Sequence, residues 1–280
     1  MKIGISTYAC YALPLGMFLP LIAESGYTSF SLGSLKEHSQ YHTVEGCRRL
    51  YKLTRALGLE MESVHAPAGF REGKLLDISS PDPVVRRYAI EETKYAIEAA
   101  AKCQAPYVVV HPIGTKWKEH FCLKDRSESS LESLAILQEY CKKSNVTLTV
   151  ENLDPPEGIV FDNILKHAMD MGLYFCYDSG HSNIYPNPSQ YWELIGSHIR
   201  TLHLHDNDGQ KDTHSILGEG TFPWKAFGAW IIQANYSGVI GLECRFEGKN
   251  PDDLKNWLKA NIDFVHHQIL GRDRVETNTR

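Results

Sequence analysis

The sequence predicts a single-domain α/β protein with the (β/α)8 architecture of a TIM barrel. Short runs rich in β-branched and aromatic residues recur eight times along the 280 residues, and helical patterns separate them. Such alternation implies parallel strands joined by right-handed crossovers, and eight units in roughly 250 residues match this barrel. A doubly wound open sheet is the competing fold, but no glycine-rich phosphate-binding motif occurs at a strand-to-helix turn. We expect the barrel to span residues 1–270 and a polar tail to occupy 271–280.

The predicted strands follow one another at intervals that leave room for helices between them. Their composition suits a sheet, because β-branched and aromatic side chains pack well on a pleated surface. In chain order the strand runs are KIGIST, YTSFSL, LEMESVHA, PYVVVHP, VTLTVEN, LYFCYDSG, IRTLHLH and GVIGLECR. The clearest helical patterns are Arg48–Leu57, Val84–Cys103, Leu131–Lys143 and Asp252–Leu270.

Two of these helices have capping signals at their start. Asp82 suits the N-cap position because its carboxylate can accept a hydrogen bond from a free backbone N–H, and Pro83 suits the first helical position. Ser129 and Glu132 have the spacing of a capping box, which predicts that the next helix begins there.

Composition and charge narrow the functional classes. The net charge of −5 gives no general attraction for nucleic acids or anionic lipids. No apolar run approaches the roughly 20 residues that a membrane-spanning helix needs, and the start MKIGISTYAC leads into a strand rather than forming a signal peptide. The seven cysteines are scattered and never form a C-x-x-C pair, which favours reduced thiols and a cytoplasmic location.

Six successive strand runs, the third to the eighth, end on a side chain that can bind a metal ion. In a TIM barrel the C-terminal ends of the strands meet at one mouth, where these enzymes have their active sites. The six side chains are His65, His111, Glu151, Asp178, His203 and Glu243, with His181 just beyond the sixth strand.

The alternation of side chains along a strand predicts that these groups point into the barrel. In TLHLHD, the apolar residues Leu202 and Leu204 face the helices, so His203 and His205 face the interior. His203 is the last residue inside the strand. His205 lies one layer further out, and we expect it at the rim.

A lone histidine at a strand end is more often a hydrogen-bonded residue than a metal ligand, and a buried glutamate can belong to an ion pair. Six such groups that converge on one place are harder to explain without a metal ion, because buried charge without a partner costs several kcal/mol. The joint pattern therefore favours a divalent metal site. An oxygen-rich ligand set suits Mn²⁺, Mg²⁺, Co²⁺ or Zn²⁺ and does not select among them. The predicted ligands are Glu151, Asp178, His203 and Glu243.

A second cluster follows in KDTHSILGEGTFPW, where Asp212 and His214 are spaced D-x-H ahead of a glycine-containing loop. Alone, this stretch is typical of a polar loop. Beside six metal-capable strand ends, it predicts a second group of ligands.

These motifs resemble those of the xylose isomerase-like barrel superfamily, which contains sugar isomerases and epimerases together with endonuclease IV. The resemblance covers nearly the whole chain. It implies that the four predicted ligands bind a common metal ion, that Glu151 and Glu243 also move the substrate proton, and that His181 helps to hold the substrate. The motifs are ENL at Glu151, D-x-G-H at Asp178–His181, H-x-x-D at His203–Asp206, D-x-H-x-x-x-G-x-G at Asp212–Gly220, and Glu243.

Endonuclease IV is the rival interpretation of the same motifs. All nine positions that match its three-zinc ligand set are present, which leaves additional metal ions open. Its DNA-facing loops need clustered Lys and Arg, whereas the loops here are acidic and contain prolines, with Arg71, Lys74, Lys116 and Lys118 as the cations near the mouth. The ligand positions beyond the common metal site are His65, His111, His181, Asp212 and His214.

The favoured function is a metal-dependent isomerase or epimerase acting on a keto sugar, a sugar phosphate or a keto-polyol through an enediolate. An endonuclease IV-type AP endonuclease, a metal-dependent polyol dehydratase or lyase, and a non-catalytic binding barrel are the alternatives. Besides His181, we expect Arg245 to bind the substrate, as would His65 and His111 if they hold no ion. The expected partner is a small sugar rather than nucleic acid or a membrane, and a homo-oligomer is left open. Aromatic residues that could wall the pocket are Tyr8, Phe70, Trp117 and Trp224.

Overall fold

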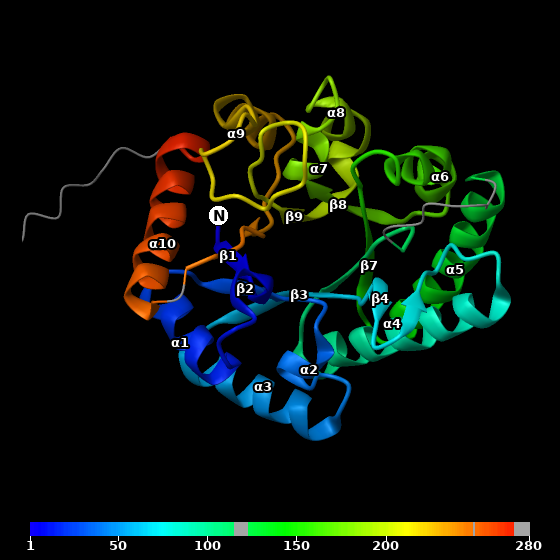
Figure 1. Ribbon diagram of the computed structural model, residues 1–280, viewed down its shortest axis with the longest axis horizontal. Helices are drawn as coiled ribbons and strands as arrows, with labels where there is room; N and C mark the ends of the chain where they lie inside the picture. The colour runs from blue at the N-terminus through cyan, green and yellow to red at the C-terminus, as the bar shows by residue number, and fades with distance from the viewer. Residues whose placement is uncertain (115–122, 249, 272–280) are drawn as a thin grey trace, which may run out of the picture.

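Eight parallel strands form one curved sheet, and helices surround it on the outside (Figure 1). The computed structural model describes residues 1–114, 123–248 and 250–271. The strand order is β10-β1-β2-β3-β6-β7-β8-β9. The strands are β1 (Ile3–Ser6), β2 (Ser29–Leu32), β3 (Glu60–His65), β6 (Tyr107–Val110), β7 (Thr147–Glu151), β8 (Tyr174–Asp178), β9 (Ile199–His203) and β10 (Ile240–Leu242).

The two ends of this sheet meet and close the barrel. Leu204, just beyond β9, forms a parallel bridge with Leu242 of β10. The N–H of Leu204 donates to the carbonyl of Gly241 at 2.9 Å, and the N–H of Glu243 donates to the carbonyl of Leu204 at 2.9 Å. The predicted single-domain (β/α)8 barrel is confirmed, and its closing seam holds the backbone of Glu243 beside β9.

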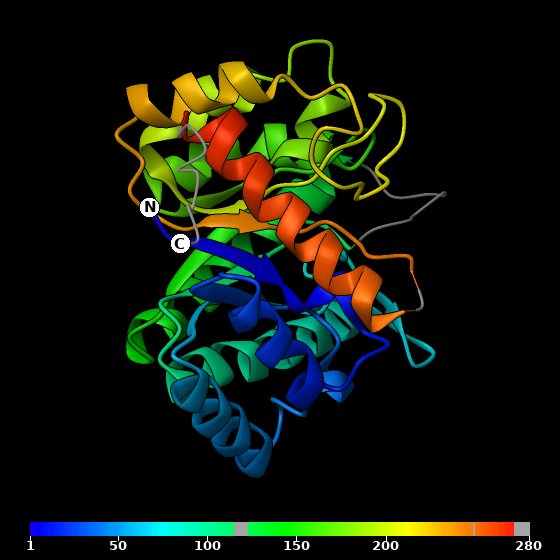
Figure 2. The ribbon, with the colours of Figure 1, turned by 90° about the vertical axis from the view of Figure 1, so that its left-hand side faces the viewer.

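The helices connect successive strands around the outside of the barrel. Helix α10 (Pro251–Phe264) packs next to the N-terminal part of the chain (Figure 2), where the Tyr27 hydroxyl donates to the carbonyl of Leu258 at 2.8 Å. A π-helical turn, Val265–Ile269, extends this helix. The helices are α1 (Leu15–Glu24), α2 (Lys36–Ser39), α3 (Val44–Leu57), α4 (Pro83–Cys103), α5 (Leu123–Lys143), α6 (Gly158–Asp170), α7 (Ser179–Asn183), α8 (Gln190–Ile195), α9 (Trp224–Gln233) and α10 (Pro251–Phe264).

The structure confirms one of the two predicted helix starts. The Asp82 carboxylate accepts a hydrogen bond from a backbone N–H in the first turn of α4 at 2.8 Å. The predicted capping box is wrong, because α5 begins at Leu123 and therefore contains Ser129 and Glu132 in its interior. Both side chains instead accept hydrogen bonds from the Arg86 guanidinium of α4, at 3.0 and 3.1 Å. The two side chains therefore connect α5 to α4 and do not cap a helix.

Small and polar side chains fill the barrel interior below its C-terminal mouth. Thr149, Cys176 and Thr201 are buried, and each lies two residues before the end of its strand, on the inward face. The Thr201 hydroxyl donates to the Thr149 hydroxyl at 3.3 Å. The outward faces carry apolar residues such as Leu148 and Val150, which are buried beneath the helices. The last inward residues of these strands therefore stand on a packed floor.

One hairpin was not predicted from the sequence. Strands β4 (Gly69–Arg71) and β5 (Lys74–Leu76) pair in antiparallel fashion after β3. Their turn contains Glu72 and Gly73, whose φ angles of 48° and 75° are both in the left-handed region, where glycine is the favoured residue. This hairpin carries Arg71 to the C-terminal mouth of the barrel.

The structure also bears on the membrane and disulfide predictions. Among the described residues, no helix is long and apolar enough to cross a bilayer. The six cysteines in the described part of the chain are buried and free. Beyond Gly271 the predicted polar tail lies outside the described residues, as do Lys116, Trp117 and Lys118.

Candidate metal centre

Four side chains meet at the C-terminal mouth of the barrel. Glu151 ends β7 and Asp178 ends β8. His203 ends β9, and Glu243 directly follows β10. All four are buried, and one ligand atom from each lies within 4.8 Å of the others. The structure brings together the four residues that the sequence predicts as metal ligands.

This cluster contains polar atoms that other protein groups do not satisfy. Among the described residues, Glu151 Oε2 and His203 Nδ1 are buried without a hydrogen-bond partner. His203 Nδ1 lies 3.1 Å from Glu151 Oε2 and 3.1 Å from Glu243 Oε2, so three polar atoms face one another without hydrogen-bond geometry. Unsatisfied buried groups are costly, and a divalent cation would accept lone pairs from all three atoms. The residues present therefore fit a metal ion chemically.

The charges of the cluster keep its glutamates ionised. Burial alone would raise the pKa of Glu151, but the interaction with His203 opposes it, and the pKa of this carboxyl lies well below its usual range. Burial likewise opposes ionisation of Glu243, yet the interactions with His203 lower its pKa to about 2. Two ionised carboxylates at this position favour a cation between them.

Two further histidines approach Glu151 from neighbouring strands. His65 ends β3 and His111 directly follows β6, and their Nε2 atoms lie 3.3 and 3.5 Å from Glu151 Oε2. His65 Nδ1 is 2.7 Å from the carbonyl of Ala66, so a proton on Nδ1 donates to the backbone and leaves an electron pair on Nε2. Burial lowers the pKa of His111, which favours the neutral ring that metal binding requires.

Asp212 and two histidines form a second cluster beside the first. His181 Nε2 in α7 lies 3.5 Å from Asp212 Oδ2, and His214 Nε2 lies 3.1 Å from the same oxygen. The Nδ1 atoms of these rings are each 2.9 Å from a backbone carbonyl, that of Asn152 for His181 and that of Glu243 for His214. Both rings therefore direct Nε2 toward Asp212, as suits a ligand whose orientation is fixed by a second hydrogen bond.

The prediction that His205 lies at the rim is wrong. Its side chain is fully buried, one layer beyond the end of β9. Its Nε2 is 3.1 Å from Asp178 Oδ2 and 3.7 Å from Asp212 Oδ1, and its ring stacks on that of His214 with centroids 3.9 Å apart. Helix α7 covers this ring so closely that a Cβ at Gly180 would stand 1.9 Å from it. His205 thus links the two clusters.

Both clusters adjoin a cavity of about 820 Å³ at the mouth of the barrel, and Tyr8 lines it as expected. Arg245 is exposed and does not line the cavity, although its side chain interacts with the Tyr8 hydroxyl. Phe70 is exposed and Trp224 is buried, where its Nε1 donates to Asp206 at 2.7 Å, so neither forms a wall. Lining residues that the sequence did not single out are Tyr11, Ser34, Asp154, Glu157 and Lys211.

Comparison with known proteins places this geometry in a family. A family model described as "Xylose isomerase-like TIM barrel" matches residues 19–266. The chain belongs to this family. The superfamily suggested by the sequence motifs is therefore confirmed, and the metal-capable strand ends all lie within the matched region.

Relatives of the chain include both unassigned and named proteins. It is 26% identical to an uncharacterized protein of Methanocaldococcus jannaschii, over 99% of this chain and 94% of that one. It is 24% identical to fructoselysine 3-epimerase of Shigella flexneri, over 87% of this chain and 90% of that one. The solved D-psicose 3-epimerase from Clostridium cellulolyticum H10 superposes with a TM-score of 0.82 at 16% identity, covering 96% of this chain and 99% of that one. That structural likeness shows a shared fold.

Proposed function

We propose that the protein is a metal-dependent isomerase or epimerase of a keto sugar, a sugar phosphate or a keto-polyol. The observation that carries this proposal is the meeting of Glu151, Asp178, His203 and Glu243 beside an open cavity at the catalytic end of the barrel. The similarity to a fructoselysine 3-epimerase over most of both chains supports the substrate class.

The four residues of the first cluster would hold the divalent ion. Three carboxylates and one imidazole leave Mn²⁺, Mg²⁺, Co²⁺ and Zn²⁺ as candidates. An ion held there would supply Lewis acidity, which would polarise a substrate carbonyl and acidify the neighbouring C–H bond. Asp178 and His203 serve as ligands only, because each is buried away from the cavity lining.

Glu151 and Glu243 would move the proton. Both line the cavity, and their lowered pKa values keep them ionised at neutral pH, which is the state that a general base needs. They belong to strands separated in the barrel by β8 and β9, so they reach the cavity from different sides. One glutamate takes the proton from the carbon beside the carbonyl, which leaves an enediolate, and the other, after it has taken up a proton from solvent, donates that proton to the same carbon. Return to the opposite face inverts that carbon.

Histidines at the cavity would orient the substrate. His181 lines the cavity, and its Nδ1 contact with the backbone of Asn152 directs Nε2 away from that backbone, toward Asp212 and the opening. His65 and His111 also line the cavity and could contact substrate hydroxyls. Arg245 would act through Tyr8, since it is Tyr8 that faces the cavity.

A zinc-dependent AP endonuclease is the second candidate. It is favoured by the approach of His65 and His111 to Glu151 and by the grouping of Asp212 with His205 and His214, because these positions would suit additional ions. The cavity wall argues against it. Asp154 and Glu157 line the same opening, and acidic residues there repel the phosphates that a nuclease must bind.

A product assay tests the proposed function. The protein would be stripped with a chelator, reloaded with Mn²⁺ and incubated with a panel of ketoses, ketose phosphates and fructosamines. We expect a new epimer or aldose for at least one substrate, detected by chromatography, and no product from the metal-free protein. Full conversion by metal-free protein, or no conversion of any substrate by the reloaded protein, would contradict the proposal.

A further inference from the structure

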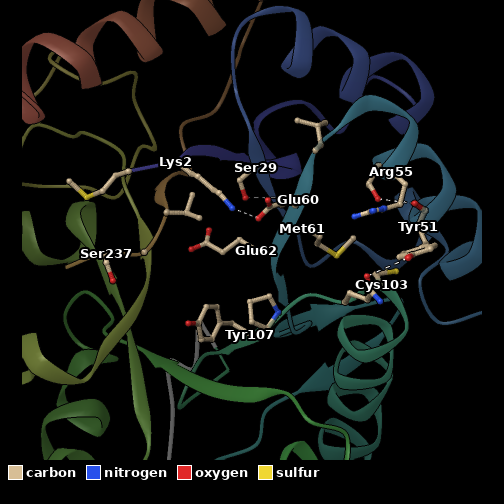
Figure 3. Close-up of a pocket in the computed structure, with 17 residues that line it drawn as sticks. Lys2, Ser29, Tyr51, Arg55, Glu60, Met61, Glu62, Cys103, Tyr107 and Ser237 are labelled. Atoms are coloured by element: carbon tan, nitrogen blue, oxygen red, sulfur yellow. Dashed lines mark hydrogen bonds and ion pairs between the residues drawn. The ribbon is translucent and has the colours of Figure 1, made fainter. Parts of the chain in front are cut away.

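A second cavity, of about 700 Å³, opens at the opposite end of the barrel (Figure 3). Its lining includes residues at or just before the N-terminal ends of the parallel strands. Lys2 precedes β1, Glu60 begins β3, Tyr107 begins β6 and Val239 precedes β10. The metal-capable clusters lie at the C-terminal ends of the same strands, so the reaction proposed above makes no use of this cavity.

Glu62 brings a carboxyl group to this cavity from a β-bulge. The register between β2 and β3 shifts after Phe30. Phe30 pairs with Met61 but Ser31 pairs with Ser63, so Glu62 is the extra residue of the bulge. A bulge re-aims a side chain that strict alternation would place on the other face. Glu62 Oε2 lies 3.2 Å from the position that a Cβ at Gly241 would occupy. The absence of a side chain at Gly241 therefore leaves room for the carboxyl inside the barrel.

This carboxyl has an unsatisfied oxygen in a buried position. The Glu62 residue is 5% exposed, and its Oε1 has no hydrogen-bond partner among the described residues. Burial raises its pKa to about 8, against a smaller lowering by His203. Lys2 does not neutralise it, because its ammonium pairs with the exposed Glu60 at the edge of the cavity (Figure 3). An unpaired buried carboxyl costs stability that an apolar residue would not, so packing alone does not account for it.

We propose that this cavity is a second binding site, for a small organic cation whose ammonium or guanidinium group binds the Glu62 carboxylate. Such a group supplies the hydrogen-bond donor that Oε1 lacks, together with the charge that stabilises an ionised carboxylate away from water. Met61 and Tyr107 line the cavity near Glu62 and offer apolar surface to the carbon chain of the ligand (Figure 3). Lys2 and Arg55 are exposed cations of the same lining, so the ligand's positive end is directed inward, away from them.

A carbon-13 NMR titration of the full-length protein labelled in glutamate tests this site. Three probes of similar size differ in charge: butylammonium, n-butanol and butyrate. We expect a saturable shift of the Glu62 carboxyl resonance toward the ionised value with butylammonium, and an affinity at least about tenfold higher than for butanol, as a charge-assisted hydrogen bond implies. The Gln variant lacks this resonance, so binding by the variants is followed by the amide shifts of residues that line the cavity. Glu62→Gln should weaken butylammonium binding at least about tenfold, whereas Glu60→Gln, the control at the cavity edge, should change it less than about threefold.

Three outcomes would overturn this site: equal butylammonium binding by wild type and Glu62→Gln, tighter binding of butyrate than of butylammonium, or no saturable shift with any probe. The amide spectrum reports whether each variant is folded. If Glu62→Gln fails to fold, Glu62→Met keeps the side-chain volume without a polar group and replaces it in the comparison. Because the readout is binding at the N-terminal end, it is independent of the reaction proposed at the C-terminal end.

Discussion

Glu151 and Glu243 carry the proton in the proposed reaction. Replacing either by Gln keeps the side-chain size but removes the basic oxygen, so kcat should fall at least about 100-fold. The measurement is kcat at saturating metal, which separates lost proton transfer from weaker metal binding. Glu60→Gln, at the opposite end of the barrel, is the matched control and should retain activity within about twofold. A Gln variant that keeps more than about a tenth of wild-type kcat would remove that residue from the pair.

His205 contacts Asp178, which is one of the four proposed metal ligands. One oxygen of Asp178 accepts a hydrogen bond from the backbone N–H of His181 at 2.7 Å, and the other faces His205 Nε2 at 3.1 Å. We expect His205→Ala to weaken divalent-metal binding about tenfold or more, because the carboxylate loses the contact that orients it. His205→Gln, which can still offer an N–H to Asp178, should recover part of that affinity in a calorimetric titration. Wild-type affinity in the Ala variant would show that His205 only fills space.

At the scale of elements, the loop between β9 and α9 carries Asp212 and His214 of the second cluster, and Asp206 holds that loop in place. Its carboxylate accepts hydrogen bonds from the backbone N–H of Gly218 at 2.9 Å and of Phe222 at 3.2 Å. It also accepts from Trp224 Nε1 at 2.7 Å. One buried side chain thus fixes both ends of the segment that presents Asp212 to the cavity.

Asp206→Asn should destabilise the protein by about 1–3 kcal/mol, because an amide NH2 would face donors where an oxygen now accepts. Urea unfolding followed by tryptophan fluorescence gives this free energy. Asp208→Asn is the control, since Asp208 is exposed in the same loop and should change stability by about 0.5 kcal/mol or less. Equal effects of the two substitutions would mean that Asp206 does not anchor the loop.

The elements that sequence patterns predict best are those governed by a local period. The period of two along β7 and β9 directs Glu151 and His203 inward, and the parallel arrangement brings their ends together, so the first cluster follows from the sequence. Features that depend on distant parts of the chain cannot be predicted in this way. His205 was directed inward by the same period, but its burial depends on α7 folding over it at Gly180. The period of two does not predict the direction of the Glu62 side chain either, because a bulge at this residue turns it to the other face.

For the whole molecule, the proposed ligands come from β7, β8, β9 and the residue after β10, so a bound ion would join strands on both sides of the closing seam. Chelator treatment should therefore lower Tm, by on the order of 5 °C when the free metal had been about 100-fold above its Kd. Re-addition of the metal should restore Tm. The Asp178→Asn variant is the control, and its Tm should respond much less. A metal-induced shift as large as in wild type would place the ion elsewhere.

The most direct test of the proposed activity follows the proton itself. The metal-loaded protein would be incubated in heavy water with a panel of ketoses and keto-polyols, and the same preparation with a duplex containing an abasic site at low salt. We predict deuterium at the carbon beside the carbonyl of at least one sugar, no exchange with Glu151→Gln, and an intact duplex. Cleavage of the duplex at low enzyme concentration, abolished by Glu151→Gln and accompanied by no exchange into any sugar, would contradict the proposed activity and support the endonuclease.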